Sequence, residues 1–359
     1  NGWGDSAIII PYLLFYRYGD ASPIEKYWSN MNKYIKYLVN DSTNFIRNND
    51  PNGYYGDWLS VGESTPLDLC NTAFCVYVCD LMVEMGNIIG KDQTEIDVYR
   101  EYANNYREAW CHKFLNEDGS TKCSTQTSYV LGLKFNIIPD NLKAASADKL
   151  AENIVSRGNK LTTGFMGVSY LMPVLCQYGH TDVAFALLEQ EEYPSWLYPV
   201  LQGATTIWER WNSYTIENGF GDANMNSFNH YSYGSIMEWA FSTILGISED
   251  RTSADNVGLK HFILRPTKGG QMTYAKGFYQ SAYGKIESSW SYENGKFSYS
   301  CSIPANSTAT LYLEGTENSE IFEGKDLAKN NQGIKYIGFE NGRHVFTLES
   351  GNYSFSMNI

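Results

Sequence analysis

Hydrophobic side chains recur every three or four positions through most of the first 247 residues, which predicts a series of amphipathic helices. In the segment that begins at Ser22-Pro23, Trp28, Met31, Ile35 and Leu38 share one helical face. Caps and glycine stops mark about nine such segments. They span residues 6–18, 22–38, 66–89, 93–114, 125–136, 144–157, 165–178, 181–191 and 227–246.

The helices follow one another in pairs without a sequence repeat, and long loops at 41–64 and 191–226 separate some of them. Loops of this length in a compact domain usually carry function. Helical hairpins that deliver such loops to one end predict a mainly α fold, an (α/α)6 toroid. A closed toroid of this kind needs six pairs of helices, so we expect it to be incomplete at the N-terminus, with further helices before Asn1.

From about residue 253 the hydrophobic period changes to two, which predicts strands. Glu293-Asn294-Gly295 and Glu340-Asn341-Gly342 are hairpin turns between alternating segments, at 283–292 with 296–303 and at 334–339 with 343–348. Further strands at 307–313 and 353–357 complete a small antiparallel β-sandwich. We expect a helical toroid domain at 1–250 and a β-domain at 251–359, joined by a linker at 248–253.

The amino-acid composition limits the classes of partner that the chain is expected to bind. The net charge of −13 disfavours nucleic acid, and no apolar run is long enough to indicate a membrane partner. Aromatic residues make up 15% of the chain, which suits either an ordinary core or a sugar-binding cleft. The seven cysteines form no zinc or redox motif, and an odd number slightly favours a cytoplasmic over an oxidising compartment.

Glu209 is the sharpest candidate for chemistry, because Trp208, Arg210 and Trp211 surround it in a loop. The alternative is an exposed ion pair with Arg210. Downstream, His230 follows amide side chains that suit sugar hydroxyls, although a histidine at such a position, taken alone, is more often a helix-start cap or a core residue. The five histidines lack metal-ligand spacing, so no metal or cofactor is expected.

Two further loops carry an aromatic ring beside a carboxylate. Trp3 and Asp5 open the chain, with helix capping as the alternative role for Asp5, and Trp58 follows Asp57. Glycoside hydrolysis requires two carboxyl groups, about 6.5–9.5 Å apart for inversion of the anomeric centre and about 5–5.5 Å for retention. The candidates for the second group are Asp5, Asp57, Glu63 and Asp222, and the sequence does not rank them.

Seven motifs occur in one order along essentially the whole chain. They are Gly2-Trp3-Gly4-Asp5, Gly56-Asp57-Trp58-Leu59, Thr125-Gln126-Thr127, Thr163-Gly164-Phe165, Glu192-Tyr193-Pro194-Ser195-Trp196, Gly203-Ala204-Thr205-Thr206-Ile207-Trp208-Glu209-Arg210-Trp211 and Met225-Asn226-Ser227-Phe228-Asn229-His230-Tyr231. In this order they resemble the bacterial α-L-rhamnosidases, glycoside hydrolase family 78. The last two blocks are the most specific.

The resemblance implies an inverting hydrolase of terminal α-L-rhamnose in glycosides or polysaccharides, with Glu209 as the general base. It places Trp3, Trp58 and His230 in the rhamnose subsite with Asp5 nearby, and Trp211 is added as a substrate-binding candidate. The family's general acid lies in an acidic motif before the Gly-Trp-Gly-Asp block. We therefore expect that acid upstream of this chain, and the 359-residue chain alone to be nearly inactive.

Three questions stay open at this level. Another α/α-toroid glycosidase or a polysaccharide lyase is the alternative among enzymes, and a non-catalytic sugar-binding scaffold is the alternative outside them. The aglycone is not specified, and homo-oligomerisation is not decided.

Overall fold

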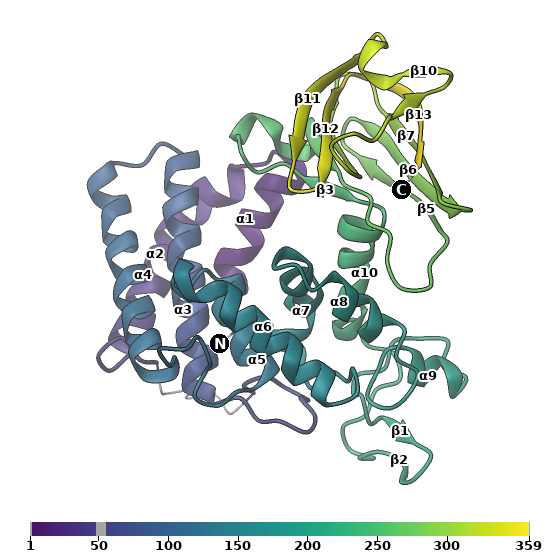
Figure 1. Ribbon diagram of the computed structural model, residues 1–359. Coiled ribbons are helices and arrows are strands. Elements are labelled where there is room, and N and C mark those ends of the chain that lie inside the picture. The colour runs from purple at the N-terminus through teal and green to yellow at the C-terminus, as the bar shows by residue number, and fades with distance from the viewer. Residues whose placement is uncertain (1, 48–54, 359) are drawn as a thin grey trace. The chain divides into compact units, whose positions relative to one another are not determined.

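The computed structural model describes residues 2–47 and 55–358, so part of the predicted 41–64 loop lies outside the described residues (Figure 1). The chain forms two compact units. The first unit comprises Asn1–Tyr12 and Ser22–Ile236, and the second comprises Leu13–Ala21 and Met237–Ile359. The domain boundary proposed at residue 250 stays a prediction.

The helices of the first unit follow the hydrophobic pattern closely. The buried face of the second helix contains the residues that the period selected, such as Trp28 and Ile35. Asp92 and Thr125 cap two helices by accepting hydrogen bonds from the Thr94 and Ser128 amides. The longer helices are α1 (Ser6–Tyr18), whose residues from Leu13 onward belong to the second unit, and α2 (Ser22–Asn40), α3 (Leu67–Ile88), α4 (Gln93–Phe114), α5 (Gln126–Lys134), α6 (Asp140–Ser156), α7 (Phe165–Gln177) and α8 (Thr181–Leu188).

Helix α3 lies at the core of this unit and packs along α4 (Figure 1). By length and composition α3 is apolar enough to cross a membrane, contrary to the sequence-based expectation, but 78% of its apolar window is buried inside the protein. Such burial is that of a core helix. Its three cysteines, Cys70, Cys75 and Cys79, are free and buried, as expected of small hydrophobic residues, and burial raises the pKa of Cys75 to about 12.

The predicted helix at 227–246 is wrong at its start. Helical structure begins only with the 3₁₀ turn Ser232–Ser235 and continues through α10 (Ile236–Trp239) into a π-helical turn, Ala240–Ile244. Residues 227–230 instead run beside 207–209, since the Glu209 amide donates to the Ser227 carbonyl and the His230 amide donates to the Ile207 carbonyl, both at 2.8 Å. These backbone bonds compete with the helix.

The predicted loop 191–226 contains structure that the sequence did not reveal. A short helix, α9 (Leu197–Leu201), begins where the Ser195 hydroxyl accepts a hydrogen bond from the Tyr198 amide at 3.0 Å. A two-stranded ribbon, β1 (Tyr214–Thr215) with β2 (Gly219–Phe220), follows it. The loop carrying Glu209 therefore lies between two ordered elements.

The second unit contains a sandwich of two sheets. The six-stranded sheet has the order β10-β9-β13-β7-β6-β5, and the five-stranded sheet has the order β11-β12-β8-β4-β3. Phe346 of β12 contacts Phe355 of β13, with 6.1 Å between ring centroids, so the two inner faces pack together. The strands are β3 (Ile247–Glu249), β4 (His261–Leu264), β5 (Tyr274–Ser281), β6 (Gly284–Glu293), β7 (Lys296–Ile303), β8 (Thr308–Glu314), β9 (Phe322–Glu323), β10 (Asp326–Leu327), β11 (Ile334–Glu340), β12 (Arg343–Leu348) and β13 (Gly351–Asn358).

Both predicted hairpins of this unit are confirmed. Asn294 and Asn341 have positive φ values of 51° and 50°, and each precedes a glycine, as a tight hairpin turn requires. Two details differ from the prediction. The strands β4 and β8 are parallel, and part of the predicted linker at 248–253 belongs to β3, which pairs with β4.

Candidate active site

The hydrogen bonds of Asp57 connect three of the sequence motifs. Its carboxylate is buried and accepts hydrogen bonds from the Thr127 hydroxyl and from the backbone amides of Gly164, Met166 and Gly167, the latter three at 2.8–3.1 Å. Burial raises the pKa of Asp57, and these four hydrogen bonds oppose the rise. The carboxylate thus anchors the N-terminus of α7 to the loop that carries Trp58.

Gly164 makes this junction sterically possible. A Cβ atom there would lie 2.3 Å from the Trp58 carbonyl oxygen and 2.4 Å from the Asp57 carbonyl oxygen. The Phe165 amide then donates to the same Trp58 carbonyl at 2.9 Å. The two chain segments touch backbone to backbone, which only glycine permits here.

Tyr55 brings Trp3 and Trp58 together. The centroid of its ring lies 5.3 Å from that of Trp3 and 5.5 Å from that of Trp58, and Trp3 and Tyr55 are 42% and 49% exposed. Such a row of partly exposed rings is a surface on which the C–H face of a sugar can stack. Sequence reasoning missed Tyr55; its only signal was an aromatic ring three residues before Trp58.

The Asp5 carboxylate stabilises the turn that carries Trp3. This carboxylate is 1% exposed and accepts hydrogen bonds from the Gly2 amide at 2.6 Å and the Tyr34 hydroxyl at 2.9 Å. Burial, and then the Asp5 charge, raise the pKa of Tyr34, so the hydroxyl keeps its proton and donates. Gly4 is packed against Tyr34, since a Cβ atom there would lie 2.9 Å from the hydroxyl oxygen.

A cavity of about 450 Å³ lies beside Trp3. Phe165, Met166, Tyr170 and Tyr231 are among its lining residues. The His230 ring stacks on two of them, with centroids 5.2 Å from Phe165 and 5.0 Å from Tyr231. Its Nδ1 accepts a hydrogen bond from the Ser232 amide at 3.3 Å. His230 thus lies behind the cavity wall.

Glu209 is held by the segment that leads to His230. The Ser227 amide donates to its Oε2 at 2.8 Å, while the Glu209 amide donates to the Ser227 carbonyl. Arg210 is directed elsewhere, to the Asn212 side chain and the Met225 carbonyl. Within residues 2–47 and 55–358, Glu209 forms no ion pair and its Oε1 no hydrogen bond, so the alternative of a Glu209–Arg210 pair is not found.

Trp211 is buried behind this loop. It is 3% exposed, its indole N–H donates to the Thr163 carbonyl at 2.9 Å, and its ring stacks on Tyr233 at 3.8 Å. Tyr233 in turn donates to the Leu59 carbonyl, next to Trp58. Trp211 therefore links the Glu209 loop to the Trp58 loop through Tyr233.

The candidates for a second carboxyl group are either occupied by hydrogen bonds or exposed. Asp5 and Asp57 are buried in the hydrogen bonds described above. Glu63 binds the Arg157 guanidinium at 2.6 Å and accepts three further hydrogen bonds, from Gln126, Asn153 and Thr162. Asp222 is exposed and accepts from the Asn224 amide at 2.8 Å. None of the four is a free, cavity-facing acid.

Asp57→Asn is expected to destabilise the first unit by about 2–5 kcal/mol, because an amide group would face two of the four buried donors. Denaturant unfolding followed by fluorescence measures the change. Asp222→Asn removes the same charge at an exposed site and serves as the control, with an expected change within about 0.5 kcal/mol. Equal stability of the two variants would show that Asp57 is not the anchor.

Known proteins match this chain over nearly its whole length. The model of the bacterial α-L-rhamnosidase six-hairpin glycosidase domain matches residues 1–244, and that of the bacterial α-L-rhamnosidase C-terminal domain matches residues 246–328. An α-L-rhamnosidase of Streptomyces avermitilis is 36% identical over 356 residues, and one of Formosa agariphila is 33% identical over 367; each alignment covers 99% of this chain.

Solved structures of α-L-rhamnosidases also resemble this chain. The crystal structure of the Streptomyces avermitilis α-L-rhamnosidase complexed with L-rhamnose has a TM-score of 0.90 at 35% identity, and the α-L-rhamnosidase from Dictyoglumus thermophilum has 0.87 at 27% identity. Each alignment covers 99% of this chain, but 33% and 40% of those chains. The chain likewise spans 33% and 38% of the two curated relatives. The expected α/α toroid followed by a β-domain is confirmed.

Proposed function

The chain belongs to the bacterial α-L-rhamnosidases, and from this we propose that it supplies the general base, but not the general acid, of an inverting active site for terminal α-L-rhamnose in glycosides or polysaccharides. The observation that carries the proposal is the state of Glu209. One carboxylate oxygen is fixed by the Ser227 amide, and the other has no hydrogen-bond partner among the described residues.

Glu209 is proposed as the general base. An inverting hydrolase needs a carboxylate that removes a proton from water as the water attacks the anomeric carbon. The Ser227 amide fixes the direction of the carboxylate, which leaves Oε1 to accept the proton. Arg210 does not contribute an ion pair, so the backbone amide supplies the support instead.

We assign the rhamnose subsite to the surface around Trp3, with Tyr55 and Trp58 as stacking rings and His230 behind the cavity wall. Asp5 is then a positioning residue, because its hydrogen bonds stabilise the turn that carries Trp3. Trp211 has the same kind of role, since its buried ring supports the Glu209 and Trp58 loops through Tyr233.

Trp3→Ala is expected to weaken binding of L-rhamnose by about tenfold or more, since the variant loses a stacking face. Calorimetric titration of the 359-residue chain measures the dissociation constant. Tyr27 is 47% exposed on α2, and Tyr27→Ala is the matched control that removes an exposed ring elsewhere. If both variants bind L-rhamnose equally well, the subsite is not at Trp3.

The general acid is proposed to lie outside these 359 residues. The four candidate carboxyls are occupied or exposed, and the curated relatives are about three times as long as the matched segment. Fluoride leaves an anomeric carbon with little help from an acid, whereas a phenol needs protonation. Without its acid, the chain should therefore favour rhamnosyl fluoride strongly.

We expect the 359-residue chain to hydrolyse α-L-rhamnosyl fluoride while releasing phenol from phenyl α-L-rhamnoside more slowly, by roughly the 10²–10⁴-fold contribution of a general acid. A fluoride electrode and phenol absorbance give the two rates. Comparable rates on both substrates would place an acid within this chain.

A further inference from the structure

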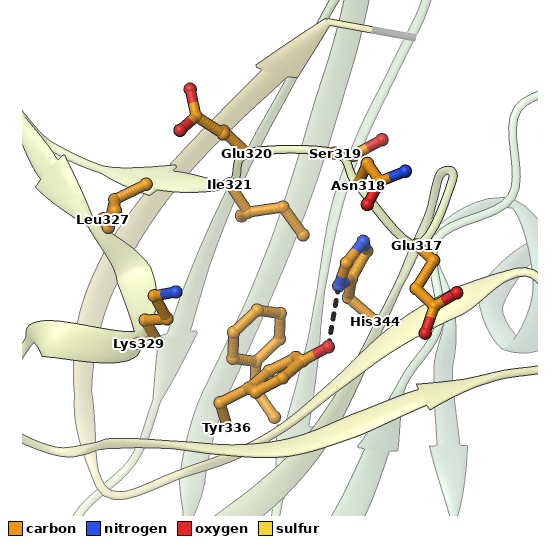
Figure 2. Close-up of a pocket in the computed structure, with 10 residues that line it drawn as sticks. Glu317, Asn318, Ser319, Glu320, Ile321, Leu327, Lys329, Tyr336 and His344 are labelled. Atoms are coloured by element: carbon orange, nitrogen blue, oxygen red, sulfur yellow. Dashed lines mark hydrogen bonds between the residues drawn. The ribbon is translucent and has the colours of Figure 1, made fainter.

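The second unit has a cavity of its own, of about 280 Å³, beside the edge strand β11 of the five-stranded sheet (Figure 2). Its inner wall consists of His344 and Phe346 from β12 together with Ile321, all buried. Tyr336 of β11 lies along the lower edge of the cavity in Figure 2 and is 38% exposed. The Tyr336 side chain is therefore partly accessible to a ligand from solvent.

Hydrogen bonds fix the Tyr336 ring. His344 is 5% exposed, and its Nε2 donates to the Thr316 carbonyl at 2.8 Å, because a carbonyl can only accept. In the neutral imidazole Nδ1 is then the acceptor, and it lies 3.1 Å from the Tyr336 hydroxyl, which donates to it. The ring is held before any ligand arrives, which reduces the entropy cost of binding.

The rim of the cavity is polar. Glu317, Asn318, Glu320 and Lys329 are exposed around the opening. Across the described ranges, neither glutamate nor the lysine forms an ion pair with another side chain. Their carboxylate, amide and ammonium groups can therefore donate to and accept from the hydroxyl groups of a ligand without first breaking ion pairs.

We propose that this cavity is a second, non-catalytic binding site for one neutral pyranose ring, a 6-deoxy sugar such as rhamnose. The C–H face of the sugar would stack on Tyr336, the exocyclic methyl would contact Ile321 and Leu327, and the hydroxyls would bind the rim. The volume lies just below the roughly 300–1,000 Å³ of pockets for drug-sized ligands, which suits a single ring. The choice of rhamnose rests on the proposed function; the site itself does not.

Two histidines report on the two sites independently. His230 stacks on residues that line the Trp3 cavity, and His344 lines the second cavity. In the 359-residue chain labelled with ¹³C-histidine, titration with methyl α-L-rhamnopyranoside to tens of millimolar is expected to shift the ring signals of both. Unchanged His344 signals in the wild-type protein would overturn the second site.

Variants separate the two proposals. Tyr336→Ala should weaken the His344 response by about tenfold or more and leave the His230 response intact, while Tyr336→Phe, which keeps the stacking ring but loses its hydrogen bond to His344, should weaken the His344 response less than Tyr336→Ala does. Lys335→Ala, an exposed neighbour on β11 outside the cavity lining, is the control and should change neither. A His344 response that survives Tyr336→Ala contradicts the second site, whereas a His230 response that survives Trp3→Ala contradicts only the rhamnose subsite of the first unit.

Discussion

Replacing Glu209 with Gln is expected to lower the rate of α-L-rhamnosyl fluoride hydrolysis by roughly 10²–10⁴-fold, the usual contribution of a general base. The amide keeps the size of the side chain and an oxygen for the Ser227 amide, but it cannot remove a proton from water. The effect should appear in kcat rather than in substrate binding, because the base acts only as the water attacks.

Glu217→Gln provides the matched control for this substitution. Glu217 is exposed between β1 and β2 of the same loop region, so the variant makes the same chemical change away from Ser227. Its rate should equal that of the wild-type chain. A Glu209→Gln chain with unchanged rate and unchanged L-rhamnose binding would remove Glu209 from the mechanism.

Gly164→Ala is expected to cost about 3 kcal/mol or more of unfolding free energy, since the new methyl group would meet backbone atoms that cannot move aside. The nearest are the carbonyl oxygens of Trp58 and Asp57 at 2.3 and 2.4 Å and the Ser60 amide nitrogen at 2.7 Å. The backbone of Gly164, with φ −90° and ψ −156°, suits any residue. Space, and not conformation, is therefore the reason for glycine.

The control for this prediction is Gly234→Ala, where the nearest neighbour of the new Cβ atom is an Ile207 carbon at 3.6 Å. Its stability should stay within about 1 kcal/mol of the wild type. Chemical denaturation of the two variants under identical conditions gives both values. Similar stabilities would mean that the Trp58 and Phe165 segments are not tightly packed.

The parts of the fold that could be predicted from the sequence are those with local signals. Helices α2 to α5 begin at caps or prolines within a residue or two of their predicted starts, and both Asn-Gly hairpins have the predicted turn. In each case the residues that determine the structure lie within a few positions of it. Predictions failed where the partner is distant, because residues 227–230 pair with 207–209 instead of starting a helix.

Prediction of the candidate site from the sequence is limited for the same reason. Glu209, Trp3, Trp58 and His230 were selected from motifs, and their roles stay predictions. What the sequence could not supply is which carboxylates are already used, since Asp57 meets Thr127 and the α7 amides only through the fold. Tyr55 was missed for a similar reason: its place between Trp3 and Trp58 depends on two segments meeting.

The central claim is that Glu209 activates a water on the face of the sugar opposite the leaving group. The most direct measurement is proton NMR of the rhamnose first released from α-L-rhamnosyl fluoride by the 359-residue chain, recorded before the anomers equilibrate. Inversion predicts β-L-rhamnose as the first product, formed at a rate that falls in Glu209→Gln. Initial release of α-L-rhamnose would contradict it.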